Sequence, residues 1–310
     1  MAAVAAVSSS FAQVSITGGL AFGFIKDIQD KTTGAAAHGL VNTDAYIDIN
    51  ATEDLGSGMK LSGTFEFNAD GQRKATTYAG DKSLVVSTSA ATFAIANTRS
   101  GGNQSAALVA PVNLWQGFFD VSGVITRLPI DVAAVSIPLT PAITASVKYV
   151  EASSDGGGEP GSVTMVYGGT YAANGLKATL QYNVTNFTDG LKTTLGTTDP
   201  RTASTDLSVI YDAGVAKVGF GYDSARRGKP NGTDEAATLL GVSVPFGKFS
   251  AGLNYGKRDT SSFAQAGVQY DLSKRTNVNA SYGTYTTGKG AVGGGDLVQD
   301  TTKVSLNHSF

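Results

Sequence analysis

Residues that could carry out covalent or metal chemistry are scarce in this sequence. It contains no Cys and two His residues, His38 and His308, which lie far apart and have no neighbour at a metal-ligand spacing. The Gly runs at 156–158 and 293–295 lack the Lys and the helix context of a phosphate-binding loop. We find no nucleophile elbow and no Ser or His with an orienting partner. The sequence therefore predicts neither an enzyme nor a bound metal or cofactor.

Charged side chains that alternate with apolar ones form a second candidate set. Alternation with a period of two is typical of a β-strand that has one apolar and one polar face. In the segments 42–50, 60–68 and 143–149 the apolar residues occupy one face and polar residues occupy the other. The charges on these polar faces are Asp44, Asp48, Lys60, Glu66 and Lys148.

The alternation continues along the whole chain. Further examples are 14–24, 177–184, 249–256 and 303–310. We count roughly sixteen such segments of about ten residues each, which is the length that a tilted strand needs to cross a bilayer. No segment with a helical period competes with this pattern.

The connections between these segments alternate in length. Long segments include 26–41, 69–80, 153–161, 188–202, 224–235 and 287–299. Short ones include 53–58, 89–91, 172–175, 212–214 and 245–248. Long loops on one side and short turns on the other are typical of a membrane barrel.

The composition favours a membrane barrel over a soluble β-sandwich. Charged residues make up 15% of the chain, against about 25% in soluble proteins, and the net charge of −2 includes no basic block for nucleic acid. A barrel of about sixteen strands encloses an aqueous lumen and satisfies every backbone hydrogen bond within the bilayer. We therefore predict an all-β fold, a transmembrane antiparallel β-barrel of about 16 strands. Tyr residues near both ends of the strands agree with aromatic girdles.

The first residues have a different character from the rest of the chain. Residues 1–12 are small and apolar, and Ser10 and Ala12 occupy the −3 and −1 positions of a small-x-small cleavage site. We interpret 1–12 as a signal-peptide remnant and 13–310 as a single transmembrane β-barrel domain. The alternative is a mildly apolar N-terminus without a targeting role.

Four stretches resemble the trimeric general porins of Gram-negative outer membranes. They are VSITGGLAFG (14–23), TEDLGSGMKLSGTFEF (52–67), YDLSKRTNVNASYGTY (270–285) and VSLNHSF (304–310). The resemblance implies a homotrimer in the outer membrane that lets ions and small hydrophilic solutes diffuse passively. It also implies that the assembly machinery reads the terminal Phe310; the alternative is a lipid-facing anchor only.

The family's third external loop folds into the barrel, and the resemblance places it within 100–128. Unlike enteric porins, this loop has no PEFGG tract. Opposed basic and acidic groups at such a narrowing would select ions by charge. Our candidates for the constriction are Arg99, Asp120, Arg127, Lys60 and Lys148, with Asp44, Asp48 and Glu66 on the lumen wall; the alternative is that these charges are merely solvated.

Two other interpretations remain open. A substrate-specific channel would share the same strand pattern, as would a structural surface barrel without an open pore. Loop carboxylates could also bind lipopolysaccharide through divalent cations, although solvated loop charges are the simpler interpretation. These carboxylates are Asp155, Glu159, Asp189, Asp199, Asp234 and Glu235.

Overall fold

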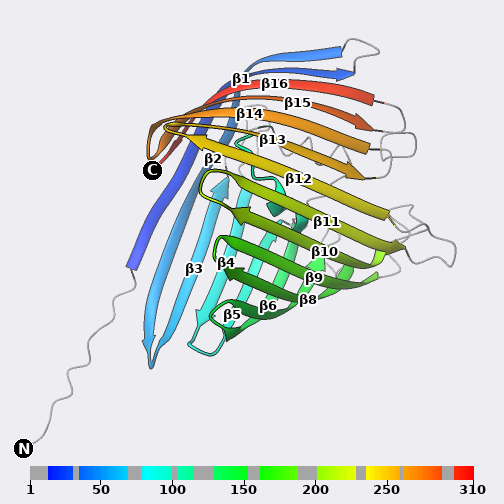
Figure 1. Cartoon of the computed structure of the whole chain (residues 1–310). Helices are drawn as coiled ribbons and strands as arrows, with labels where there is room; N and C mark the ends of the chain where they lie inside the picture. The colour runs from blue at the N-terminus through cyan, green and yellow to red at the C-terminus, as the bar shows by residue number, and fades with distance from the viewer. Residues whose placement is uncertain are drawn as a thin grey trace, which may run out of the picture.

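The computed structural model is a closed antiparallel β-barrel of sixteen strands (Figure 1). It describes residues 13–30, 35–68, 78–99, 103–112, 114, 129–152, 161–187, 201–227, 235–258, 261–287 and 297–310. Each strand pairs with the next strand along the chain, and β1 pairs with β16 to close the ring. In Figure 1 the blue β1 accordingly lies beside the red β16. The predicted fold class is confirmed.

Within the described residues, the elements are sixteen strands and one short helical turn between β5 and β6. No helix within the described residues is long and apolar enough to cross a bilayer. The elements are β1 (Gln13–Asp30), β2 (Ala35–Gly56), β3 (Met59–Asn68), β4 (Tyr78–Ser87), β5 (Thr92–Arg99), η1 (Asn103–Ala107), β6 (Pro129–Thr140), β7 (Ile143–Ala152), β8 (Ser162–Ala173), β9 (Leu176–Phe187), β10 (Arg201–Asp212), β11 (Lys217–Arg227), β12 (Glu235–Phe246), β13 (Phe249–Arg258), β14 (Ser261–Ser273), β15 (Thr276–Thr287) and β16 (Leu297–Ser309).

The alternating sequence sorts side chains between the two surfaces of the barrel. Large apolar residues face outward along every strand; Ile95 and Leu253, for example, are 67% and 63% exposed. Their neighbours in sequence face the lumen and are mostly polar or small. A soluble protein buries its apolar residues in a core, whereas here they face outward. This arrangement is stable where lipid covers the outer surface.

The short turns depend on residues that tolerate positive φ. Ser57 and Gly58 connect β2 to β3 with φ of 53° and 77°, and Asn174 and Gly175 connect β8 to β9 with φ of 52° and 77°. Two consecutive positive φ values match the twist of the flanking strands in a tight hairpin. These turns therefore fix the register on the short-loop side.

One predicted loop is largely strand. The polar segment 26–41 looks like a long connection, but β1 continues to Asp30 and β2 begins at Ala35. The β1–β2 ladder runs as far as the pair of Asp30 and Ala35. A ladder that extends beyond the bilayer needs no apolar face, so its polar composition resembles that of a loop.

The seam between the first and last strands is tightly packed. The backbone N–H of Gly18 donates to the carbonyl of Phe310, and the N–H of Phe310 donates back, both at 3.1 Å. A Cβ at Gly18 would lie 2.6 Å from the Phe310 ring and 2.6 Å from the Tyr46 carbonyl. Only a residue without a side chain allows this approach. The closure of the barrel therefore depends on Gly18.

We predict that Gly18→Ala destabilises the barrel. Overpacking a tight site of this kind costs about 1–3 kcal/mol. The matched control is Gly169→Ala, because a Cβ at Gly169 meets nothing nearer than 4.0 Å. Samples in SDS are heated to a series of temperatures, and the gel then shows the temperature at which the band of the folded barrel is lost. Equal temperatures for the two variants would contradict the proposed role of the seam.

Candidate functional site

The interior of the barrel has two unlike sides. On β8–β16, which we call the covered wall, many inward polar side chains are buried, among them Asp206, Ser208, Asp223, Asn254, Gln265, Asn279, Ser281, Lys303 and Ser305. On β2–β7, the open wall, the inward side chains are at least partly exposed, as at Asp48, Asn50, Glu66, Thr98 and Lys148. The accessible lumen therefore lies along β2–β7.

The segment 103–112 lies against the covered wall. Its helical turn η1, drawn in teal in Figure 1, contacts β9, β10, β11 and β12. Hydrogen bonds hold the segment at both ends. The Asn103 amide donates to the Thr179 carbonyl at 3.0 Å, and the Asn279 amide donates to the Pro111 carbonyl at 2.6 Å. Between them, the Ala110 N–H donates to the side chain of Asn254 at 3.2 Å.

Inward glycines on consecutive strands make room for this segment. We call Gly219, Gly241, Gly252 and Gly267, on β11 to β14, the glycine track. A side chain at Gly219 or Gly241 would overlap the carbonyl of Ala107, and one at Gly267 would overlap that of Pro111. Ala107 itself is completely buried. The segment therefore rests directly on the backbone of the barrel.

Four carboxylates lie on the inner face of the open wall. We call Asp44, Asp48, Glu66 and Asp81 the carboxylate row; they belong to β2, β3 and β4. Asp48 and Glu66 are direct cross-strand partners. Glu66 interacts electrostatically with the other three members. Asp81 accepts a hydrogen bond from the hydroxyl of Thr98 at 2.8 Å.

The basic groups of the inner wall lie mostly beside acids. Arg258 forms a buried ion pair with Asp223. Lys303 is 1% exposed, and Asp44 lies within electrostatic range of its ammonium group. On the open wall, Lys148 lies within electrostatic range of Asp206, a carboxylate that also accepts a hydrogen bond from Asn183. These cations therefore contribute little uncompensated positive charge to the lumen.

The predicted site residues fall into three groups. Asp44, Asp48, Glu66 and Lys148 lie on inward faces, with Glu66 near the long-loop end of β3 and the other three in the middle part of their strands. Lys60 is the second residue of β3, next to the short turn and paired in register with Asp54. Arg99 ends β5, and its side chain lies outside the described residues, as do Asp120 and Arg127 entirely.

Several inner-wall residues were not among the sequence candidates. Lys303 lies on the polar face of the last strand, so the alternation of apolar and polar residues alone places its side chain inside the barrel. Asp81 adjoins a segment assigned to a loop, 69–80, which hid its strand position. The pairing of Asp223 with Arg258 joins β11 to β13, and the alternation pattern carries no information about such partners.

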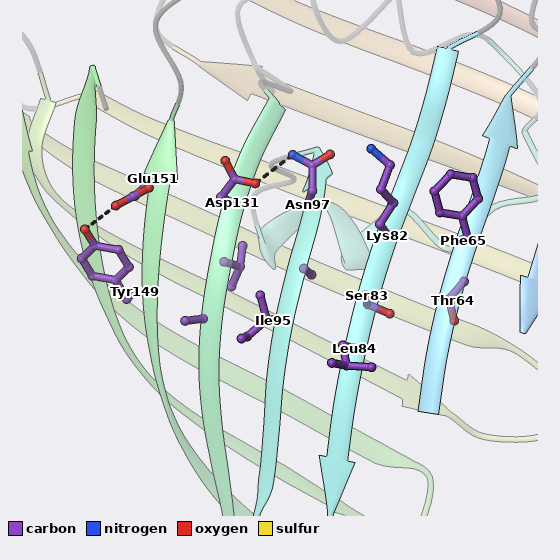
Figure 2. Close-up of a pocket in the computed structure, with 13 residues that line it drawn as sticks. Thr64, Phe65, Lys82, Ser83, Leu84, Ile95, Asn97, Asp131, Tyr149 and Glu151 are labelled. Atoms are coloured by element: carbon purple, nitrogen blue, oxygen red, sulfur yellow. Dashed lines mark hydrogen bonds between the residues drawn. The ribbon is translucent and has the colours of Figure 1, made fainter. Parts of the chain in front are cut away.

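Figure 2 shows a hollow on the outer surface across β3–β7. Polar side chains near the long-loop ends form its rim: the Asn97 amide donates to Asp131 at 2.9 Å, and the Tyr149 hydroxyl donates to Glu151 at 2.5 Å. Lys82 lies over the ring of Phe65. Leu84 and Ile95 lie further from the loops. This change from apolar to polar matches the edge of a bilayer.

Among the described residues, no group of three His, Asp or Glu side chains is arranged to hold a metal ion. Comparison with curated protein sequences gives no match. The model of the Gram-negative porin family, by contrast, matches residues 1–310. The chain belongs to the Gram-negative porin family. It is therefore a passive outer-membrane channel.

Solved porins have the same fold as this porin. The anion-selective porin from Comamonas acidovorans superimposes with a TM-score of 0.73 at 17% identity, covering 97% of this chain and all of that one. A triple mutant of the Rhodopseudomonas blastica porin gives a TM-score of 0.63 at 14% identity, covering 96% of this chain and all of that one. At these identities the likeness concerns the fold alone.

We predict that a disulfide joins the segment to the wall in the double variant Ala110→Cys with Gly252→Cys. A Cβ at Gly252 would lie 2.8 Å from that of Ala110 and would overlap the carbonyl oxygen of Val242. The bond therefore forms only when the segment and the strand move apart to the Cβ separation of about 3.5–4.5 Å that disulfides need. The porin has no other Cys. Mass spectrometry after thiol alkylation measures the bond. Ala110→Cys with Gly169→Cys is the control, because Gly169 faces outward; equal cross-linking in both would contradict the described path.

Proposed function

We propose that this porin is a general diffusion pore for ions and small hydrophilic solutes. The observation that carries the proposal is the partly exposed polar wall of β2–β7 inside a closed barrel. Water and solutes would pass along this open wall, since the covered wall is occupied. Polar side chains along the path, including Asn50, Thr64 and Ser83, favour hydrated solutes over apolar ones. Nothing in this mechanism requires a reaction or a cofactor.

We also propose that the third external loop, 100–128, narrows the pore. The anchoring of 103–112 to the glycine track supports this, because a segment fixed to one wall reduces the free cross-section. The remaining part of the loop would carry Asp120 and Arg127 toward the constriction, and Arg99 would stand at its entrance. Lys148, Asp48 and Glu66 would face it from the open wall, and Lys60 would lie nearer the short-turn side.

The distribution of exposed Tyr supports a homotrimer. Outward Tyr side chains lie on β7–β15, namely Tyr149, Tyr167, Tyr171, Tyr182, Tyr211, Tyr255 and Tyr282. Among the described side chains of β1–β6, the exposed large apolar residues are aliphatic, Met or Phe, such as Phe93 and Ile95. Tyr favours the boundary between lipid and water. We therefore propose that β7–β15 faces lipid and that the arc without Tyr packs against other copies.

The remaining proposals concern the route to the membrane. Residues 1–12 would be the remnant of a signal peptide, and 13–310 would be the single barrel domain. The assembly machinery of the outer membrane would read Phe310 together with the alternating residues before it. Lipopolysaccharide would cover the long-loop side of the barrel. The loop carboxylates that would bind it through bridging divalent cations are Asp155, Glu159, Asp189, Asp199, Asp234 and Glu235.

The proposed pore predicts a stable conductance in planar lipid bilayers. The purified trimer should insert in current steps with three sublevels, and the conductance should rise linearly with salt because the path is filled with water. Saturation by one solute would favour a substrate-specific channel instead. A folded, heat-modifiable barrel that carries no current would contradict the proposal and leave a structural barrel.

The proposed trimer predicts a difference between two single-Cys variants. Ile95→Cys places a thiol on the arc without Tyr, and Leu240→Cys places one on the lipid-facing side of β12. A short thiol-reactive cross-linker should join copies of the first variant and not of the second, as measured on denaturing gels. Cross-linking through Leu240→Cys alone would place the interface on the opposite arc.

A further inference from the structure

We infer that the pore passes cations in preference to anions and that Asp48, Glu66 and Asp81 determine this preference. The inference rests on the proposed open pore. It adds the sign of the selectivity and the residues responsible for it. The solutes favoured are small hydrated cations, since the groups concerned are carboxylates on the wall of an aqueous path.

The first argument is the accessibility of the charges. Asp48, Glu66 and Asp81 are partly exposed on the open wall, and Asp44 is exposed. The basic groups of the covered wall are not: Arg258 and Lys303 are 9% and 1% exposed. An ion in the lumen therefore meets the carboxylates directly, while these two cations lie behind other groups.

The second argument is the pairing of the charges. Arg258 forms an ion pair with Asp223, while Asp44 lies within electrostatic range of Lys303 and Asp206 within that of Lys148. The groups that interact electrostatically with Glu66 are acidic, namely Asp81, Asp48 and Asp44. Within the part of the chain that the structure describes, no ion pair joins Asp48, Glu66 or Asp81 to a basic group. The described open wall therefore carries an excess of negative charge.

The third argument is the position of the row within the ring. In the strand order of the barrel, β3 lies opposite β11. The segment 103–112 occupies the wall around β11, so it directs the aqueous path toward β2–β4. A narrow aqueous path between low-dielectric walls concentrates the field of fixed charges. The carboxylate row therefore acts on each passing ion at short range.

The experiment compares two triple variants of the full chain in planar bilayers. The test variant carries Asp48→Asn, Glu66→Gln and Asp81→Asn, which keep the shape of each side chain and remove its charge. The matched control carries Glu53→Gln, Asp131→Asn and Glu151→Gln, which remove as many charges from the outward faces of β2, β6 and β7. Reversal potentials in a potassium chloride gradient give the ratio of cation to anion permeability.

We expect a permeability ratio above one in the unaltered porin. Removing the three lumen charges should lower it by roughly threefold or more, as expected for a field focused in a narrow pore, while the control leaves it unchanged. Glu66→Gln alone should lower it partly, which keeps the test valid should the triple variant fail to fold. A ratio at or below one, or no change in folded lumen variants, would overturn the inference. A folded barrel without current would instead overturn the proposed pore itself.

Discussion

The structure depends on one requirement: every backbone N–H and C=O within a bilayer must find a partner in the protein. A sheet meets it only when its first and last strands pair, and here β1 and β16 do so along most of their length. The contact between Gly18 and Phe310 is the end of that ladder. Closure in turn assigns each residue to lipid or lumen, and the two-residue period in the sequence follows from it.

The lumen is less uniform than a ring of similar strands suggests. Glycines on β11–β14 admit the segment 103–112, and the side chains of Asn254 and Asn279 form hydrogen bonds to it. The opposite strands keep shorter or partly exposed polar side chains, among them the carboxylate row. Because the segment covers one wall of the lumen, the aqueous path runs along the other. The charges that affect transport are those on the wall that the segment leaves accessible.

Much of the fold was predictable because the side to which a strand residue points depends only on its neighbours in sequence. The side of Asp48, Glu66 and Lys148 follows from their apolar neighbours alone. Features that depend on distant partners were not predictable: the pair of Asp223 and Arg258, the burial of Lys303, and the glycine track, whose meaning appears only once the segment lies on it. The strand ends around 26–41 were misread because pairing outside the bilayer needs no apolar face.

The glycine track has a consequence for how such a channel can change. The segment that lies on it is inside the barrel, against β9–β14, so its bulk can vary while the outer surface stays the same. A larger residue within 108–112 would shrink the bore, and a smaller one would enlarge it, without a change in strand number. The width of the pore and the outer surface of the barrel can therefore change independently. Evolution or protein design can alter the pore width without altering the strands.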